Sequence, residues 1–382
     1  MEIRDLTDDE ARAALVLKWG DVEPDVLPAW VAEMDYALAP PVAEALVAAV
    51  TTGVTGYPSL GAGGARLGAS YAGFAARQFG HDVDATQVLP VVDVTAGVRL
   101  ALDAVCEPGP MVMPVPGYRP QLEVAQVTGR ERFDLTLDPD AEHAELDLDL
   151  LDHHFSRGAR SLLLTQPHNP WGRAFTRTEL EGVRDVVLRH GATVVSDEIH
   201  APLALPGATH LPYLAVEGTA AHTVAVVAAS KAFNTAGLRC AQLVTADRSL
   251  HERLTAVPDA RNDSWSTLGV VAAVAAYEEG DAWLDALRTR LGEQRDLLVD
   301  LLATHLPQAR MRRPEATYLA WVDLRAYGHD DPAAVALARG RVKLAPGHDY
   351  QPGLAGHVRL NFATSPARLR EVVRRLALAV AP

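Results

Sequence analysis

The residue best suited to chemistry in this sequence is a lysine that directly follows an apolar run. Lysine occurs three times in the 382 residues, and Lys231 comes after the apolar residues 223–229. At the end of a buried strand an ammonium group loses hydration, which lowers its pKa and favours the neutral, nucleophilic amine. A solvated surface loop is the alternative for an isolated lysine. Here Ser230 and Arg239 lie close by in sequence and could bind one anion together, as a phosphate-bearing cofactor requires.

A second element suited to an anion lies near residue 97. Gly97 and Val98 precede a helical pattern at residues 99–105, so we expect them to present free backbone N–H groups at a helix N-terminus. An ordinary glycine-containing turn fits the same residues equally well when the motif is taken alone.

Polar side chains also follow two other apolar runs. Asp197 ends the run 193–196, and Asn169 lies in the turn after residues 161–165. At the carboxyl edge of a parallel sheet such side chains point into the ligand crevice, although each could also serve its own turn. Together with the lysine and the two anion-binding elements they predict a site for pyridoxal phosphate (PLP), which the protein would orient and tune.

The elements that must position these residues indicate an α/β fold with a mainly parallel sheet, because short apolar runs alternate with helical stretches. Thr176 and Glu179 form a capping-box pattern that predicts a helix running to about His190 and closed by Gly191. The expected strands span residues 111–115, 161–165, 193–196, 223–228 and 241–245.

The pattern changes near residue 281 and predicts a second, smaller domain. A long amphipathic helix is expected at residues 283–305, followed by strands at 316–324 and 357–364 and a final Arg-rich helix. Prolines near the N-terminus favour an extended arm. We therefore expect a large PLP-binding domain at residues 46–285, and an N-terminal arm (1–45) that joins residues 286–382 in the small α+β domain.

Composition excludes several classes of function. The net charge of -14 and the pI of about 5.4 offer no cationic surface for nucleic acid or a membrane. Two distant cysteines and no long apolar segment favour a cytoplasmic location. The histidines are scattered, and His200 has no second histidine nearby, so no metal site is predicted. The glycines at 61–64 lack the third glycine and the preceding strand of a dinucleotide-binding motif.

Four motifs carry a resemblance to a known family. They are Thr95-Ala-Gly-Val98, Pro167-His-Asn-Pro-Trp-Gly-Arg173, Ser196-Asp-Glu-Ile-His200 and Ala229-Ser-Lys-Ala-Phe-Asn-Thr-Ala-Gly-Leu238. In this order they resemble the fold type I, class I/II aminotransferases. The opening Trp30-Val-Ala-Glu-Met-Asp35, with the last two motifs, is similar to the cystathionine β-lyase-like branch of carbon–sulfur β-lyases. The resemblance extends from about Trp30 to Pro366.

The resemblance implies a role for individual residues. Lys231 would bind the cofactor covalently and then remove the substrate α-proton, while Asp197 would pair with the pyridine nitrogen and Asn169 with the ring 3-oxygen. The remaining cofactor contacts it implies are Tyr118 stacked on the ring, His200, the phosphate-binding Gly97, Val98, Ser230 and Arg239, and Tyr57 from a second subunit. A homodimer with shared active sites is therefore expected. The substrate-binding residues it implies are Arg359 for the α-carboxylate, Trp30, Trp171 and Arg119.

The sequence also departs from that branch. Thr165-Gln166 stands where Cys-Asn is usual, Trp171 replaces a small residue, and Arg119 is unusual. These changes are expected near the substrate and favour a cysteine conjugate bulkier than cystathionine.

The expected activity is β-elimination from an L-cysteine S-conjugate, an amino-acid substrate, to a thiol, pyruvate and ammonia. Transamination of an amino acid uses the same residues and remains the main alternative. A regulator that binds PLP without turnover is the third possibility, but no DNA-binding extension or basic patch accompanies the domain.

Overall fold

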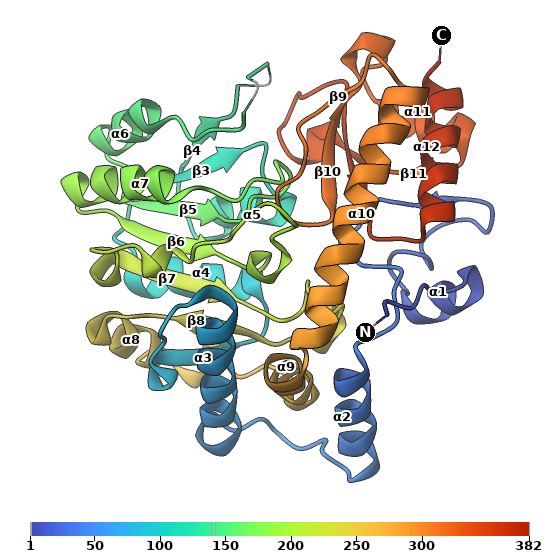
Figure 1. Cartoon of the computed structure of the whole chain (residues 1–382). Helices are drawn as coiled ribbons and strands as arrows, with labels where there is room; N and C mark the ends of the chain where they lie inside the picture. Colours follow the sequence, from blue (N-terminus) through green and yellow to red (C-terminus); the bar gives the residue numbers. More distant parts are fainter. Residues whose placement is uncertain (1, 139, 142, 382) are drawn as a thin grey trace.

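The chain folds around a seven-stranded sheet, as a computed structural model that describes residues 2–138, 140–141 and 143–381 shows (Figure 1). Five neighbouring strands run parallel, and β8 is antiparallel to both of its neighbours. The expected α/β class is confirmed. The strand order is β2 (Val88–Val91), β8 (Ala241–Val244), β7 (Thr223–Val227), β6 (Thr193–Asp197), β5 (Ser161–Thr165), β3 (Met111–Val115) and β4 (Arg132–Thr136).

Helices cover both faces of this sheet because adjacent residues of its strands point to opposite sides. Val195 packs with α4 (Val94–Val105), α5 (Arg119–Val127) and α8 (Arg248–Thr255). Its neighbour Val194 packs with α6 (Leu148–Ser156) and α7 (Arg177–His190). The capping box of Thr176 and Glu179 is present at the start of α7, and Gly191 ends this helix with φ of 60°.

A four-stranded antiparallel sheet forms the second part of the molecule. Its order is β12 (Ala345–Pro346), β13 (His357–Asn361), β10 (Leu319–Asp323) and β9 (Arg310–Met311). The expected long helix is α10 (Asp281–His305), which runs from beside α9 (Thr267–Glu279) past β10 toward α12 (Pro366–Val380) in Figure 1. The remaining helices here are α11 (Pro332–Gly340) and α12 (Pro366–Val380), and the helices α3 (Ala65–Phe79) and α9 (Thr267–Glu279) share their apolar core with this part.

The first 51 residues contain more regular structure than expected from their prolines. A capping box of Thr7 and Glu10 starts α1 (Asp8–Ala14). Pro40 and Pro41 open α2 (Pro40–Thr51), because proline fits the first helical turn, where its missing N–H is not needed. Between them, β1 (Leu27–Pro28) pairs in parallel with β11 (Val342–Lys343). The arm is therefore attached to the second part of the molecule.

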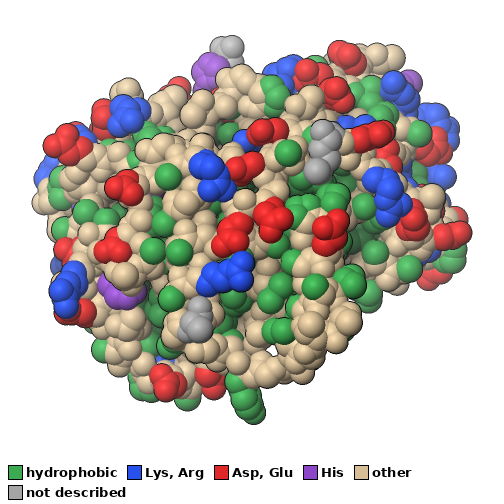
Figure 2. Space-filling view, turned by 60° about the horizontal axis from the view of Figure 1, so that its bottom comes forward, with side chains coloured by type: hydrophobic (Ala, Val, Ile, Leu, Met, Phe, Trp, Pro, Cys, Tyr) green, Lys and Arg blue, Asp and Glu red, His purple; other side chains and the backbone are tan. Residues whose placement is uncertain are grey.

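The surface carries charges of both signs. In the face shown in Figure 2, acidic and basic side chains alternate with apolar ones, and no continuous basic field is visible. Among the described helices, none combines the length and the apolar character that crossing a bilayer requires.

Candidate active site

A cavity lies where the carboxyl ends of β5, β6 and β7 meet the start of α4, segment 31–32 and β13. It encloses about 950 Å³, including its open mouth. Such a position, at the ends of parallel strands and between two sheets, is where α/β proteins bind ligands. The predicted residues that line it are Tyr118, Asn169, Asp197, His200, Ser230, Lys231, Arg239 and Arg359.

Lys231 lies just beyond β7, and its Nζ donates a hydrogen bond of 3.0 Å to the carbonyl oxygen of Ala32. Burial and, to a smaller extent, the nearby Arg359 guanidinium lower the pKa of this amine to about 8, against the opposing effect of the Glu33 and Asp197 carboxylates. An amine with this pKa is partly neutral near pH 7 to 8. It can therefore act as a nucleophile and as a proton acceptor.

Asp197 is the last residue of β6 and is almost fully buried. One carboxylate oxygen accepts a hydrogen bond of 3.1 Å from the backbone N–H of Ile199, and the other accepts from the side-chain amide of Gln121. Thr165 in turn donates to Gln121 Oε1 at 2.9 Å. Burial raises the pKa of Asp197 to about 6, against these hydrogen bonds. The carboxylate is thus poised to pair with a cationic group in the cavity.

Gln121 was not predicted as a site residue. It lies inside α5, where a glutamine has no sequence context that marks it, although it also lines the cavity.

Arg359 and Asn169 are brought together from different sheets. One terminal nitrogen of Arg359 donates to Asn169 Oδ1 at 3.1 Å, and the other donates to the carbonyl oxygen of Trp30 at 2.7 Å. The guanidinium also lies over the ring of Tyr350, at 4.9 Å from its centroid. This fixed, buried cation at the cavity wall is suited to binding a carboxylate.

His200 and Tyr118 add aromatic groups to the cavity. His200 is buried, and within the described residues its Nδ1 has no hydrogen-bond partner. Burial holds the pKa of His200 well below its usual value, so the ring is neutral. The Tyr118 side chain is 37% exposed. Its hydroxyl group lies in the buried part, and this burial raises the pKa of Tyr118.

At the anion-binding end of the cavity, the predicted start of the helix after Gly97 and Val98 is wrong. Asp93 caps α4 through a hydrogen bond of 2.8 Å to the backbone N–H of Ala96, so the helix begins at Val94 rather than near residue 99. The N–H of Gly97 already donates to the Asp93 carbonyl at 2.9 Å. A Cβ at Gly97 would approach Val226 at 3.0 Å, so this glycine is needed for close packing of α4 on the sheet.

Gly97 and Val98 therefore do not offer free N–H groups. The first-turn residues Val94 and Thr95 line the cavity instead, and their N–H groups have no preceding turn to bond. Ser230 and Arg239 complete this end, with Arg239 paired to Asp93.

Three of the predicted substrate residues lie outside the cavity. Trp171 is buried against the ring of His168 and donates its N–H to the Pro116 carbonyl at 2.9 Å. Arg119 is exposed and pairs with Glu123 and Asp349. The Trp30 side chain turns toward Lys18 and Lys343, so only its carbonyl contacts Arg359. Tyr57 is fully exposed and touches a separate surface pocket.

The donor set of the cavity fits PLP. A phosphate matches the start of α4 with Ser230 and Arg239, a protonated ring nitrogen matches the buried Asp197 carboxylate, and the unpartnered His200 Nδ1 offers a further polar contact. Among the described residues, no group of three or more His, Cys, Asp or Glu side chains is placed to hold a metal ion.

Comparison with known proteins identifies the class. Residues 23–376 match the family described as aminotransferase class I and II, and the chain belongs to this family. It is 38% identical to a candidate cystathionine beta-lyase of Mycobacterium leprae, over 99% of this chain and 98% of that protein. Identity to a cystathionine beta-lyase of Corynebacterium glutamicum is 35%, with 97% and 98% covered. A crystal structure of a candidate PLP-dependent beta-cystathionase from Corynebacterium diphtheriae matches with a TM-score of 0.93, at 32% identity and 99% coverage of both chains.

Proposed function

We propose that this protein is a PLP-dependent carbon–sulfur β-lyase that cleaves an L-cysteine S-conjugate to a thiol, pyruvate and ammonia. The observation that carries the proposal is the placement of the Lys231 amine, the Asp197 carboxylate and the Arg359 guanidinium around one cavity. The relatives named as cystathionine beta-lyases support the reaction class. The identity of the group attached to sulfur is left to experiment.

The residues of the cavity have separate roles in the reaction. When bound, PLP withdraws electrons from the substrate Cα, which makes loss of the α-proton possible. Lys231 Nζ accepts that proton, and its lowered pKa keeps a neutral amine available to do so. The Asp197 carboxylate would hold a proton on the cofactor ring nitrogen, and Tyr118, which also lines the cavity, would pack against the ring.

Arg359 orients the substrate. Its guanidinium is held by Asn169 and by the carbonyl of Trp30, so it presents a fixed cation to the α-carboxylate. With the amino acid held in this way, the electron pair that the α-proton leaves at Cα forms a Cα–Cβ double bond as the Cβ–S bond breaks. The electron pair of this bond leaves on sulfur as a thiolate, and water completes the release of pyruvate and ammonia.

The test is product formation without a second substrate. Incubation with cystathionine or an S-alkyl cysteine should release pyruvate when no keto acid is present. Product that forms only after a keto acid is added would instead establish an aminotransferase, the alternative that the family name itself favours. No turnover under either condition would favour a PLP-binding regulator. Borohydride should attach the cofactor to a peptide that contains Lys231, and attachment at another lysine would contradict the site.

We further propose a homodimer in which Tyr57 reaches the cofactor phosphate of the partner subunit. Tyr57 is fully exposed, and Val47, Val50 and Leu60, which are close to it in sequence, are exposed as well, as expected for a surface that a second copy covers. Light scattering should give twice the chain mass of 40.9 kDa.

We also propose a large domain of residues 46–285 and a cytoplasmic location. The two buried, unpaired cysteines, Cys106 and Cys240, are compatible with a reducing compartment.

A further inference from the structure

Segment 30–35 lies between the two sheets and contacts both cationic groups of the cavity. Its Ala32 carbonyl accepts the hydrogen bond from Lys231, and its Trp30 carbonyl accepts one from Arg359. Asn361 holds the segment from the second sheet, through bonds of 2.7 Å to Val31 O and 2.6 Å to Glu33 O. A shift of this segment would therefore move the acceptors of the reacting amine and of the carboxylate-binding arginine together.

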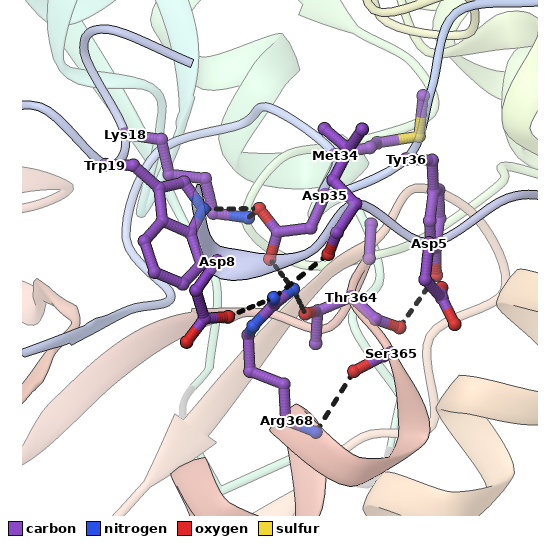
Figure 3. Close-up of polar contacts among 12 residues, drawn as sticks. Asp5, Asp8, Lys18, Trp19, Met34, Asp35, Tyr36, Thr364, Ser365 and Arg368 are labelled. Atoms are coloured by element: carbon purple, nitrogen blue, oxygen red, sulfur yellow. Dashed lines mark hydrogen bonds and ion pairs between the residues drawn. The ribbon is translucent and has the colours of Figure 1, made fainter. Parts of the chain in front are cut away.

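The far end of this segment is fixed by a buried ion pair that the reaction does not use (Figure 3). Lys18 Nζ lies 2.9 Å from Asp35 Oδ1 and donates to the Glu33 carbonyl at 3.0 Å. Both side chains are essentially inaccessible to solvent. The same Asp35 oxygen accepts a hydrogen bond of 2.8 Å from the indole of Trp19, and Arg368 of α12 lies 3.3 Å from the other oxygen.

The ion pair joins three parts of the chain that are far apart in sequence. Lys18 follows α1, Asp35 ends segment 30–35, and Arg368 lies in the first turn of α12 and also pairs with Asp8. The carbonyl of Lys18 accepts the Trp30 indole N–H at 3.2 Å, so Lys18 contacts the segment at both ends. Ions buried this deeply must keep their partners, because an unpaired charge there is strongly unfavourable.

We propose that Lys18 and Asp35 are positioning residues for the reaction: their buried pair sets the position of segment 30–35 and hence the placement of Lys231 and Arg359. This inference rests on the proposed roles of Lys231 and Arg359. It extends the active site to a cluster that lies outside the cavity and contacts neither substrate nor cofactor. The slender ammonium of Lys18 suits this position, since it reaches a carboxylate and a carbonyl within one closed space.

The experiment compares Lys18→Met with the unchanged holoenzyme. Methionine keeps the length of the side chain and leaves Asp35 paired with Arg368, but it removes the donor to Glu33 O. We expect kcat/KM for an S-alkyl cysteine to fall by about tenfold, because small displacements of positioned groups cost this much or more. Two further readouts do not depend on turnover. The dissociation constant of glycine, followed by the cofactor absorbance, should rise, and the pH midpoint of that absorbance should move.

A matched control is Asp5→Asn. Asp5 tethers the same N-terminal region through a two-bond ion pair with Arg290 of α10, at 2.7 and 2.8 Å, yet these bonds do not involve segment 30–35. This variant should lose thermal stability while kcat/KM, glycine affinity and the pH midpoint stay unchanged. If Lys18→Met also loses only thermal stability, the positioning role is wrong.

If Lys18→Met does not accumulate as folded protein, Asp35→Asn is judged by the same three readouts, because it keeps the shape of the side chain and its hydrogen bond from Trp19. Borohydride mapping separates failure of this inference from failure of the proposed function. Attachment at Lys231 with unchanged readouts in the variant overturns only the positioning role, whereas attachment elsewhere overturns the active-site assignment.

Discussion

Two lysine–aspartate pairs lie inside this protein, one fully buried and one lining an open cavity, and they differ in how their charges are used. Lys18 and Asp35 are in contact at 2.9 Å. Lys231 and Asp197 line the same cavity, but Lys231 donates to a backbone carbonyl and Asp197 accepts from Gln121 and Ile199. The first pair satisfies its own charges, whereas the second leaves its charges for a ligand.

The difference shows that burial of a lysine does not by itself identify it as a catalytic group. Burial lowers the pKa of both lysines, but the contact with Asp35 opposes this effect at Lys18 directly. At Lys231 the Arg359 cation adds to the effect of burial, and the two carboxylates that oppose it form no direct ion pair with the amine. A buried lysine without a carboxylate in contact is therefore the one that can react.

The largest expected effect is on turnover, and it distinguishes Lys231 from Lys18. Lys231→Ala should reduce pyruvate release by on the order of 10⁴-fold or more, because both covalent cofactor binding and proton transfer are lost. The thermal midpoint of this variant should change little. Turnover within tenfold of the unchanged enzyme would contradict the role of Lys231.

The second effect concerns the structural pair. Asp35→Ala leaves Lys18 and Arg368 buried without their shared carboxylate, so it should lower the free energy of unfolding by about 3–5 kcal/mol. Urea unfolding measures this change. Arg341→Ala, which removes an ion pair with Asp25 at the surface, is the control and should cost less than about 1 kcal/mol. Equal effects of the two substitutions would contradict the comparison.

The third effect concerns the pH dependence of stability that the charge of Asp197 causes in the cofactor-free protein. Its pKa is raised from 3.8 to about 6 in the folded protein, so the folded state binds this proton more tightly than the unfolded state does. The stability of the cofactor-free protein should therefore fall as pH rises from about 4 to 6, by on the order of 2–3 kcal/mol.

Asp197→Asn removes this dependence. Above pH 6 the cofactor-free variant should be more stable than the unchanged protein, while its affinity for PLP falls. Near pH 4 the two should be equally stable, which provides an internal control for thermal unfolding. If the variant is less stable than the unchanged protein at pH 7, then other groups of the folded protein already stabilise the charged Asp197 carboxylate.

The smallest effect concerns Trp171. Because its indole bonds the Pro116 carbonyl and lies outside the cavity, Trp171→Phe should cost about 1 kcal/mol of stability and leave the order of preferred cysteine conjugates unchanged. A product assay over conjugates of increasing size measures that order. A changed order would restore the prediction that Trp171 contacts the substrate.

The elements that could be predicted from the sequence are those whose signals are local. The strand ends at Asp197 and before Lys231, and the helix between Thr176 and Gly191, follow from apolar runs and caps within a few residues. The predicted start of α4 is wrong although Asp93 is a strong N-cap residue, because the helical pattern is recognisable only from Arg99 onward.

Side-chain direction accounts for the remaining errors at the site. Trp171 and Arg119 lie close in sequence to the cavity residues Asn169 and Tyr118, but their side chains point to a carbonyl and to surface acids. Gln121 faces the cavity from the first turn of α5, and Lys18 reaches Asp35 across the fold. Contacts of this kind depend on how distant elements pack and leave no local pattern in the sequence.

All three lysines of the chain contact one short segment: Lys18 at Glu33 O, Lys231 at Ala32 O, and Lys343 over the ring of Trp30. Lys18 is sealed from solvent, and Lys343 is held against an aromatic face. In the cofactor-free protein Lys231, by contrast, offers an aldehyde or acylating reagent a partly neutral amine inside an open cavity. Chemical tagging near neutral pH should therefore favour Lys231.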